Sequence, residues 1–76
     1  MNRTRRKCLA NLSEILEELK ISVETLRDEE QDYMDNMPEN LQGSERYEAA
    51  EEAVSNLDDA LNSLDEAISS IEEAMA

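Results

Sequence analysis

The chain has 76 residues, of which 20 are acidic and seven basic, and its net charge is −13. A single cysteine excludes an internal disulfide, and the absence of histidine excludes a His general base and Glu-x-x-His di-iron sites. We expect one domain, residues 1–76, with no enzymatic activity, no cofactor and no metal site.

No apolar run approaches the length of about 18 residues that a bilayer span requires. The basic start is similar to the charged region of a signal peptide. However, Glu14, Glu17 and Glu18 interrupt the segment that follows, so it is not an apolar core. The lone thiol of Cys8 fits a reducing compartment. We therefore expect a cytoplasmic protein that does not contact membranes.

Residues 1–7 form a basic arm with four of the seven cations, Arg3, Arg5, Arg6 and Lys7. Cations at a helix N-terminus oppose the helix dipole, so we expect this arm to fray. Two interpretations remain open: pairing with Glu72 and Glu73 at the other end of the chain, or binding of nucleic acid or phosphate. No aromatic residue lies among these cations, and the body of the chain is acidic. Pairing within the chain is therefore favoured, and nucleic acid is not an expected partner.

The first predicted helix covers residues 4–36. Its apolar positions are spaced alternately by three and four residues, which predicts a heptad seam, and Glu30 is the one polar residue in the pattern. The seam comprises Leu9, Leu12, Leu16, Leu19, Val23, Leu26, Tyr33 and Met37. The helix should end near Asn36, because Pro38 disfavours the α conformation at Met37.

A bend is predicted at residues 37–44, which contain the only proline and the only glycine. Ser44 is a good N-cap, and Glu45 follows it where the helix dipole favours an anion. We assign Tyr33, Pro38, Gly43 and Ser44 to the bend. These residues either shape the chain reversal or form a binding surface there, and shaping is the favoured interpretation.

The second predicted helix covers residues 45–75 and repeats every seven residues from Ala53, as AVSNLDD, ALNSLDE, AISSIEE and AMA. Such a repeat predicts a long helix with one apolar seam. That seam comprises Tyr47, Ala50, Val54, Leu57, Leu61, Leu64, Ile68, Ile71 and Met75.

The two seams match when the chain is folded back at the bend. Leu9 then meets Met75, and Leu12, Leu19 and Leu26 meet Ile71, Leu64 and Leu57. The same register places Lys20 opposite Asp65 and Arg27 opposite Asp58. This agreement predicts an all-α fold, an antiparallel helical hairpin with a heptad seam.

A flank of small residues on the second helix suggests self-association. With two residues of the first helix it comprises Cys8, Ile15, Ala53, Ala60, Ala67 and Ala74. Alanine on a half-exposed face is also simply a good helix former. A two-helix seam buries only part of each side chain, whereas ordering each residue costs about 1–2 kcal/mol of backbone entropy. We therefore expect a homodimer that forms a four-helix bundle.

An acidic row follows the outer side of the second helix. It comprises Glu51, Glu52, Asp58, Asp59, Asp65, Glu66, Glu72 and Glu73. Adjacent acids on a straight helix point apart, which disfavours cation binding. Two interpretations stay open: a solubilising surface, or a surface that imitates the phosphate backbone and binds a basic protein. One helix carries its charges more sparsely than duplex DNA, so imitation would need several helices side by side.

The segment Glu29–Arg46 resembles the middle of a group of small acidic proteins from phages and Gram-positive bacteria. In that group an "EEQ…N-x-P-E-x-L-Q-x-S-E-R" centre is followed by an "A-x-x-x-L-D-x-A" tail, which Ala53–Ala60 matches. The resemblance covers nearly the whole chain and carries no established activity. It implies a phage-type inhibitor of a host or defence protein. Six residues of this segment either form a binding surface at the bend or only shape it, and shaping is favoured: Tyr33, Asn36, Pro38, Leu41, Ser44 and Arg46.

Two functions follow as hypotheses. The first is a non-enzymatic, acidic, dimeric module that binds a basic protein partner and masks its nucleic-acid-binding surface. The alternative is a structural or assembly hairpin that only oligomerises. A weaker third possibility is a nucleic-acid accessory factor that acts through the basic arm.

Overall fold

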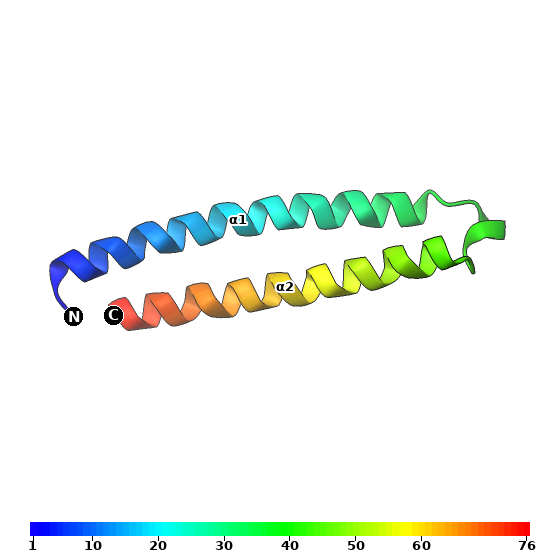
Figure 1. The fold of residues 1–76 in the computed structure, drawn as a ribbon. Coiled ribbons are helices and arrows are strands. Elements are labelled where there is room, and N and C mark those ends of the chain that lie inside the picture. Colours follow the sequence, from blue (N-terminus) through cyan, green and yellow to red (C-terminus); the bar gives the residue numbers. More distant parts are fainter.

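The computed structural model describes all 76 residues as two long antiparallel helices joined by a bend. Helix α1 covers Arg3–Asp35, a short 3-10 helix η1 covers Glu39–Leu41, and helix α2 covers Glu45–Met75. The helices lie side by side along their whole length, and both chain ends lie at the end opposite the bend (Figure 1). The fold is therefore the predicted helical hairpin.

Side-chain caps define where both helices begin. The Asn2 side chain accepts a hydrogen bond from the Arg5 backbone N–H at 2.7 Å, and Ser44 Oγ accepts one from the Tyr47 N–H at 3.3 Å. Each cap satisfies a backbone donor that has no partner within the helix. The Asn2 cap starts α1 at Arg3, so the cations of residues 3–7 lie in the first turns of the helix.

The bend does not depend on the special freedom of glycine. Pro38 has φ of −58° and ψ of 148°, which stops helical propagation after α1, and η1 follows it directly. Gly43 does not have a positive φ, and a Cβ atom added there would meet no atom within 4 Å. Pro38 and the Ser44 cap therefore carry the chain reversal, whereas Gly43 could be replaced without strain.

Helix α2 faces α1 with the whole apolar row expected from its sequence. Ala50, Val54 and Ile68 are buried, and the other members of the row are half-buried. These positions recur every three or four residues, so they form one stripe along the helix. The prediction for α2 is confirmed.

Helix α1 faces α2 with a different row from the expected one. Leu9, Leu16 and Val23 are half-buried as expected, but Leu12, Leu19 and Leu26 are 50%, 52% and 59% exposed, and Tyr33 is 41% exposed. The residue after each of these is instead buried or half-buried: Ser13, Lys20, Arg27 and Met34. Their predicted burial against α2 is therefore wrong.

The physical reason is that α1 is apolar over a wider arc than one neighbouring helix can cover. Consecutive residues are about 100° apart around a helix, so Leu19 and Lys20 lie at opposite edges of the contact. Helix α2 lies over the edge that carries Lys20 and Arg27, where both cations reach its carboxylates. The leucines of the other edge remain about half uncovered.

The hairpin is long and thin. Its radius of gyration is 17.3 Å and its axis extents are 59 × 15 × 13 Å, whereas a compact chain of this length has a radius of gyration of about 11 Å. Five of the 76 residues are buried, and no large side chain is completely enclosed. Neither helix has a stretch that is long and apolar enough to cross a membrane.

Candidate interaction surfaces

Two cations of α1 join the helices along one edge of the contact. Lys20 Nζ lies 2.5 Å from Asp65 Oδ1, and Arg27 Nε donates to Asp58 Oδ1 at 2.8 Å. These are the two interhelical pairs that the sequence register predicts. Since both occur, the predicted alignment of the helices is confirmed.

Each cation also reaches a carboxylate on its own helix. Lys20 lies 3.9 Å from Glu24, and Arg27 lies 3.1 Å from Asp28. Hydrogen bonding to Asp65 raises the pKa of Lys20 above its ordinary value of 10.5, although partial burial acts in the opposite direction. The pKa of Arg27 is likewise raised, first by its hydrogen bond to Asp58 and then by that to Asp28. Both side chains therefore remain charged at neutral pH.

The acidic row is distributed along α2 as its sequence predicts, but its members are not equivalent. Asp58 is half-buried and bonded to Arg27, and Asp65 is bonded to Lys20. The other six acids are exposed and form no ion pair with any residue of the chain. Four of them recur every seven residues on the outer side of α2, and we call them the outer acids: Glu52, Asp59, Glu66 and Glu73.

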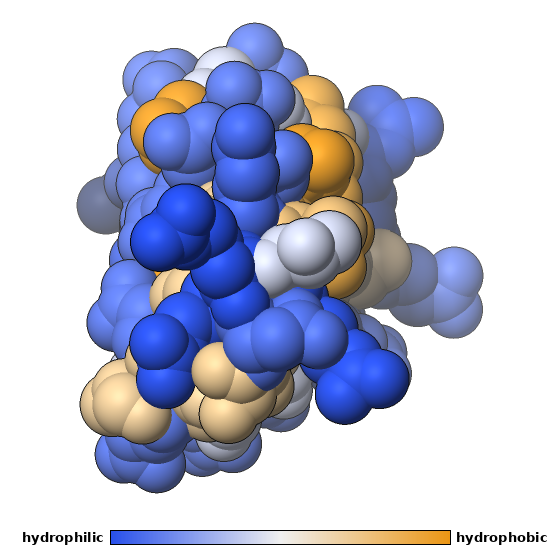
Figure 2. Space-filling model, turned by 90° about the vertical axis from the view of Figure 1, so that its left-hand side faces the viewer, coloured by the Kyte–Doolittle hydropathy of each residue, from blue (hydrophilic) through white to orange (hydrophobic).

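The opposite edge of the hairpin is apolar. Asp58 and Asp65 lie at the same edge as Lys20 and Arg27, and Ala60 and Ala67 follow these acids by two residues, or about 200° around α2. The alanines therefore lie on the same side of the hairpin as the exposed leucines of α1. Figure 2, which views the hairpin from its open end, shows the most apolar side chains gathered mainly on one side of its upper half, with smaller apolar areas on the other side and below.

This apolar face combines residues of both helices. On α1 it comprises Cys8, Leu12, Ile15, Leu19, Ser22 and Leu26, all exposed. On α2 it comprises the half-buried Ala53, Leu57, Leu64 and Ile71 with the exposed Ala60, Ala67 and Ala74. It includes every residue of the predicted dimer flank. The leucines of α1 are the part that sequence reasoning missed, because it had assigned them to the contact inside the hairpin.

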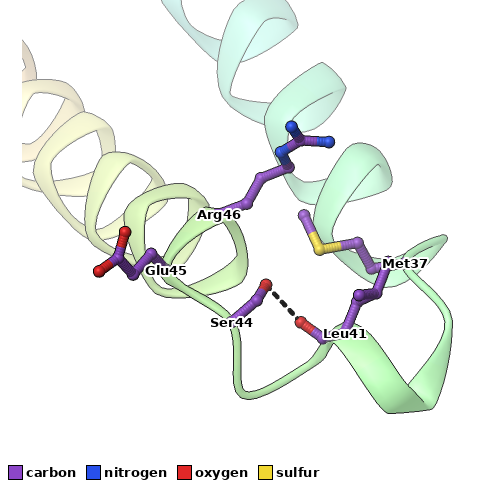
Figure 3. A pocket seen from close by; sticks show the side chains of 5 residues that line it. All are labelled: Met37, Leu41, Ser44, Glu45 and Arg46. Carbon is purple, nitrogen blue, oxygen red and sulfur yellow. Dashed lines mark hydrogen bonds between the residues drawn. The ribbon is translucent and has the colours of Figure 1, made fainter.

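The bend carries a shallow, open hollow. It is lined by Met37, Leu41, Ser44, Glu45 and Arg46, which Figure 3 shows with the Ser44 hydroxyl directed at Leu41. Ser44 Oγ donates to the Leu41 carbonyl at 2.5 Å and so stabilises the turn before α2. Of the residues assigned to the bend, Pro38 and Gly43 are exposed and Ser44 is half-buried. The hollow has one apolar wall and two opposite charges, an arrangement that defines no particular ligand.

The basic residues of α1 do not pair with the acids at the other chain end. Arg3, Arg5, Arg6 and Lys7 are all exposed, and none forms an ion pair with Glu72 or Glu73. The expected pairing within the chain is therefore not formed, because the helical conformation directs these side chains to solvent. Nowhere in the chain do three or more potential metal ligands converge.

Comparison of the chain with protein-family models, with curated proteins and with solved structures finds no match in any of the three.

Proposed function

We propose that the protein is a non-enzymatic binding module that dimerises into a four-helix bundle and presents its acids to a basic protein partner. The observation that supports this proposal most strongly is the separation of the hairpin into an acidic side and an apolar side. A surface needed only for solubility would not require this segregation. An apolar side that extends from Cys8 to Leu26 on α1 and from Ala53 to Ala74 on α2 requires a covering partner.

The partner that fits the acidic side is a basic, nucleic-acid-binding protein. The outer acids are exposed and free of competing cations, and their carboxylates recur about every 10.5 Å along α2. In a bundle, the acids of two copies would together produce a stronger negative electrostatic potential, which attracts cationic surfaces. The resemblance to small acidic phage proteins favours a host or defence protein whose DNA-binding surface becomes masked.

Neutralising the outer acids tests this function. The variant carries four substitutions and leaves both interhelical ion pairs intact: Glu52→Gln, Asp59→Asn, Glu66→Gln and Glu73→Gln. A matched control removes four exposed acids of α1 by Glu14→Gln, Glu17→Gln, Glu18→Gln and Asp32→Asn. Each tagged variant is used to capture proteins from cells that express the chain.

The wild type and the control should retain the same basic protein, and added duplex DNA should compete with its capture. The outer-acid variant should lose this protein while keeping its helical circular dichroism. Retention of the protein by the outer-acid variant, or no competition by DNA, would refute the acidic side as the binding surface.

A specific observation also favours the structural alternative, in which the hairpin only assembles. The apolar face is more extensive than the sequence predicts, since it includes Leu12, Leu19 and Leu26. Assembly through this face needs no basic partner. If the chain oligomerises but both acid variants behave like the wild type in capture experiments, the assembly function is the correct one.

A further inference from the structure

The apolar face carries no charged side chain, although 36% of the residues in the chain are charged. Twenty acids and seven cations are thus all placed elsewhere, on the ion-paired edge, on the outer sides of the helices, and at their ends. Exposed apolar patches on a monomer are usually limited to a few hundred Å². This uncharged face spans α1 from Cys8 to Leu26 and α2 from Ala53 to Ala74, and it is a surface that must be covered.

The hairpin exposes more surface than a compact chain of its size, by about the area that each partner buries in a dimer. The hairpin exposes 5691 Å², whereas a compact monomer of 8.7 kDa exposes about 4,700 Å². The excess, about 1,000 Å², is close to the roughly 800 Å² that each partner buries in a standard protein interface. The apolar face itself extends over about 30 Å of each helix, from Cys8 to Leu26 on α1 and from Ala53 to Ala74 on α2. The excess surface and this extended shape point to a partner that lies lengthwise along the hairpin.

The shape of the face favours a second copy of the chain as that partner. Along α1 the side chains are bulky, and Leu12, Ile15, Leu19 and Leu26 are each about half exposed or more. Along α2 the outermost side chains are only alanines. The bulky row of α1 forms a ridge, and the alanine row of α2 forms a lower shelf beside it. Two copies fit together when the ridge of each copy packs on the shelf of the other.

We propose that a second copy covers the apolar face, with α1 of each copy lying along the alanine row of its partner's α2. This inference deepens the proposed homodimer and rests on it. The arrangement requires a two-fold axis parallel to the helices, and it therefore places both bends at the same end of a four-helix bundle. A two-fold axis perpendicular to the helices would instead stack ridge on ridge and leave a gap between the alanine rows.

A matched pair of single substitutions tests the location of the interface. Leu19 and Ile21 are 52% and 60% exposed, but only Leu19 lies on the apolar face. Multi-angle light scattering should give twice the chain mass of 8.7 kDa for the wild type and for Ile21→Gln, and the single chain mass for Leu19→Gln. Because Leu19 is already half exposed in the hairpin, circular dichroism should show that this variant stays helical.

A second variant addresses the α2 side of the same face. Ala60 and Ala67 are exposed, so Ala60→Glu with Ala67→Glu adds no clash within the hairpin. It should also yield the single chain mass. A dimer that persists in both Leu19→Gln and the double alanine variant would place the interface elsewhere and overturn this inference, while the proposed homodimer would stand. A wild type that is monomeric at all concentrations would overturn both.

The arrangement of the two copies is tested by one distance. In a Cys8→Ser, Arg3→Cys variant, a spin label at position 3 lies at the first residue of α1, near the open end of the hairpin and outside the apolar face. Pulsed electron paramagnetic resonance should give a distance comparable with the width of a four-helix bundle. A distance of about 40 Å or more along the 59 Å hairpin would show that the bends lie at opposite ends, which would overturn the ridge-on-shelf arrangement.

Discussion

Lys20 and Arg27 are the two residues that connect the helices through charge. Their side chains are 23% and 30% exposed, so their aliphatic parts lie within the contact while their charged ends reach carboxylates. Each cation contacts one acid on each helix. No other cation forms an ion pair between the two acidic helices. Lys20 and Arg27 therefore reduce the repulsion between the helices and select the edge of α1 that α2 covers.

The raised pKa of Lys20 predicts how its contribution to stability varies with pH. Because the folded-state pKa lies above the ordinary value of 10.5, the stabilisation is fully present below pH 10.5. It is lost as pH rises through the folded-state pKa. Lys20→Met keeps much of the aliphatic chain and removes the bond to Asp65. The wild type should melt at a higher temperature than this variant near neutral pH, and the difference should shrink above pH 10.5.

Thermal unfolding followed by circular dichroism measures that difference. The two proteins differ only at position 20, so any other effect of alkaline pH acts on both melting temperatures. A difference in melting temperature that stays constant from neutral to strongly alkaline pH would contradict a stabilising role for the Lys20 charge.

At the scale of the helices, the sequence predicts α2 more completely than α1. Helix α2 has one apolar row flanked by alanine and acids, so only one of its faces can pack against a neighbour. Helix α1 has apolar residues over a wider arc, and the most apolar row includes Leu12, Leu19 and Leu26. The spacing of apolar residues alone predicts that this leucine row faces α2. It takes no account of the interhelical bonds that Lys20 and Arg27 form one position later.

A side-chain cap next to each helix, Asn2 or Ser44, determines where that helix begins. Ser44 allows the sharper test of the contribution of a cap to stability. Its hydroxyl accepts from the Tyr47 N–H and donates to the Leu41 carbonyl, so Ser44→Ala removes the α2 cap and a bond that closes the bend. The free energy of unfolding should fall by about 1 kcal/mol. Urea denaturation at one fixed chain concentration measures this change.

Ser69→Ala is the control for that substitution. Ser69 is exposed in the body of α2 and forms no side-chain hydrogen bond, so alanine should leave the stability unchanged or raise it slightly. Equal effects of Ser44→Ala and Ser69→Ala would mean that the cap does not contribute to the hairpin.

For the whole molecule, the acidic side was predictable from the sequence and the apolar face was not. The acidic row follows directly from the seven-residue repeat, and the helix register identifies Asp58 and Asp65 as its paired members. The apolar face depends on which edge of α1 remains uncovered, a property of the packed pair of helices. Cys8, Ile15 and the alanines were recognised as a flank, but without the leucines that make the face bulky.

The two sides of the hairpin should respond to salt in opposite directions. Two copies of net charge −13 repel each other, and the proposed bundle brings their acidic bends together. Salt shortens the screening length from about 10 Å at 0.1 M to about 3 Å at 1 M, so it should strengthen self-association through the uncharged apolar face. The same screening should weaken capture of a basic partner by the outer acids.

Sedimentation velocity of the wild type at several concentrations of sodium chloride measures self-association, and elution of the captured basic protein over the same range measures partner binding. The dimer fraction should rise with salt while the bound partner falls. Acidification towards the isoelectric point of about 4.1 should strengthen self-association for the same reason, since it lowers the net charge of each copy. Self-association that weakens as salt increases would mean that ion pairs, rather than the apolar face, hold the copies together.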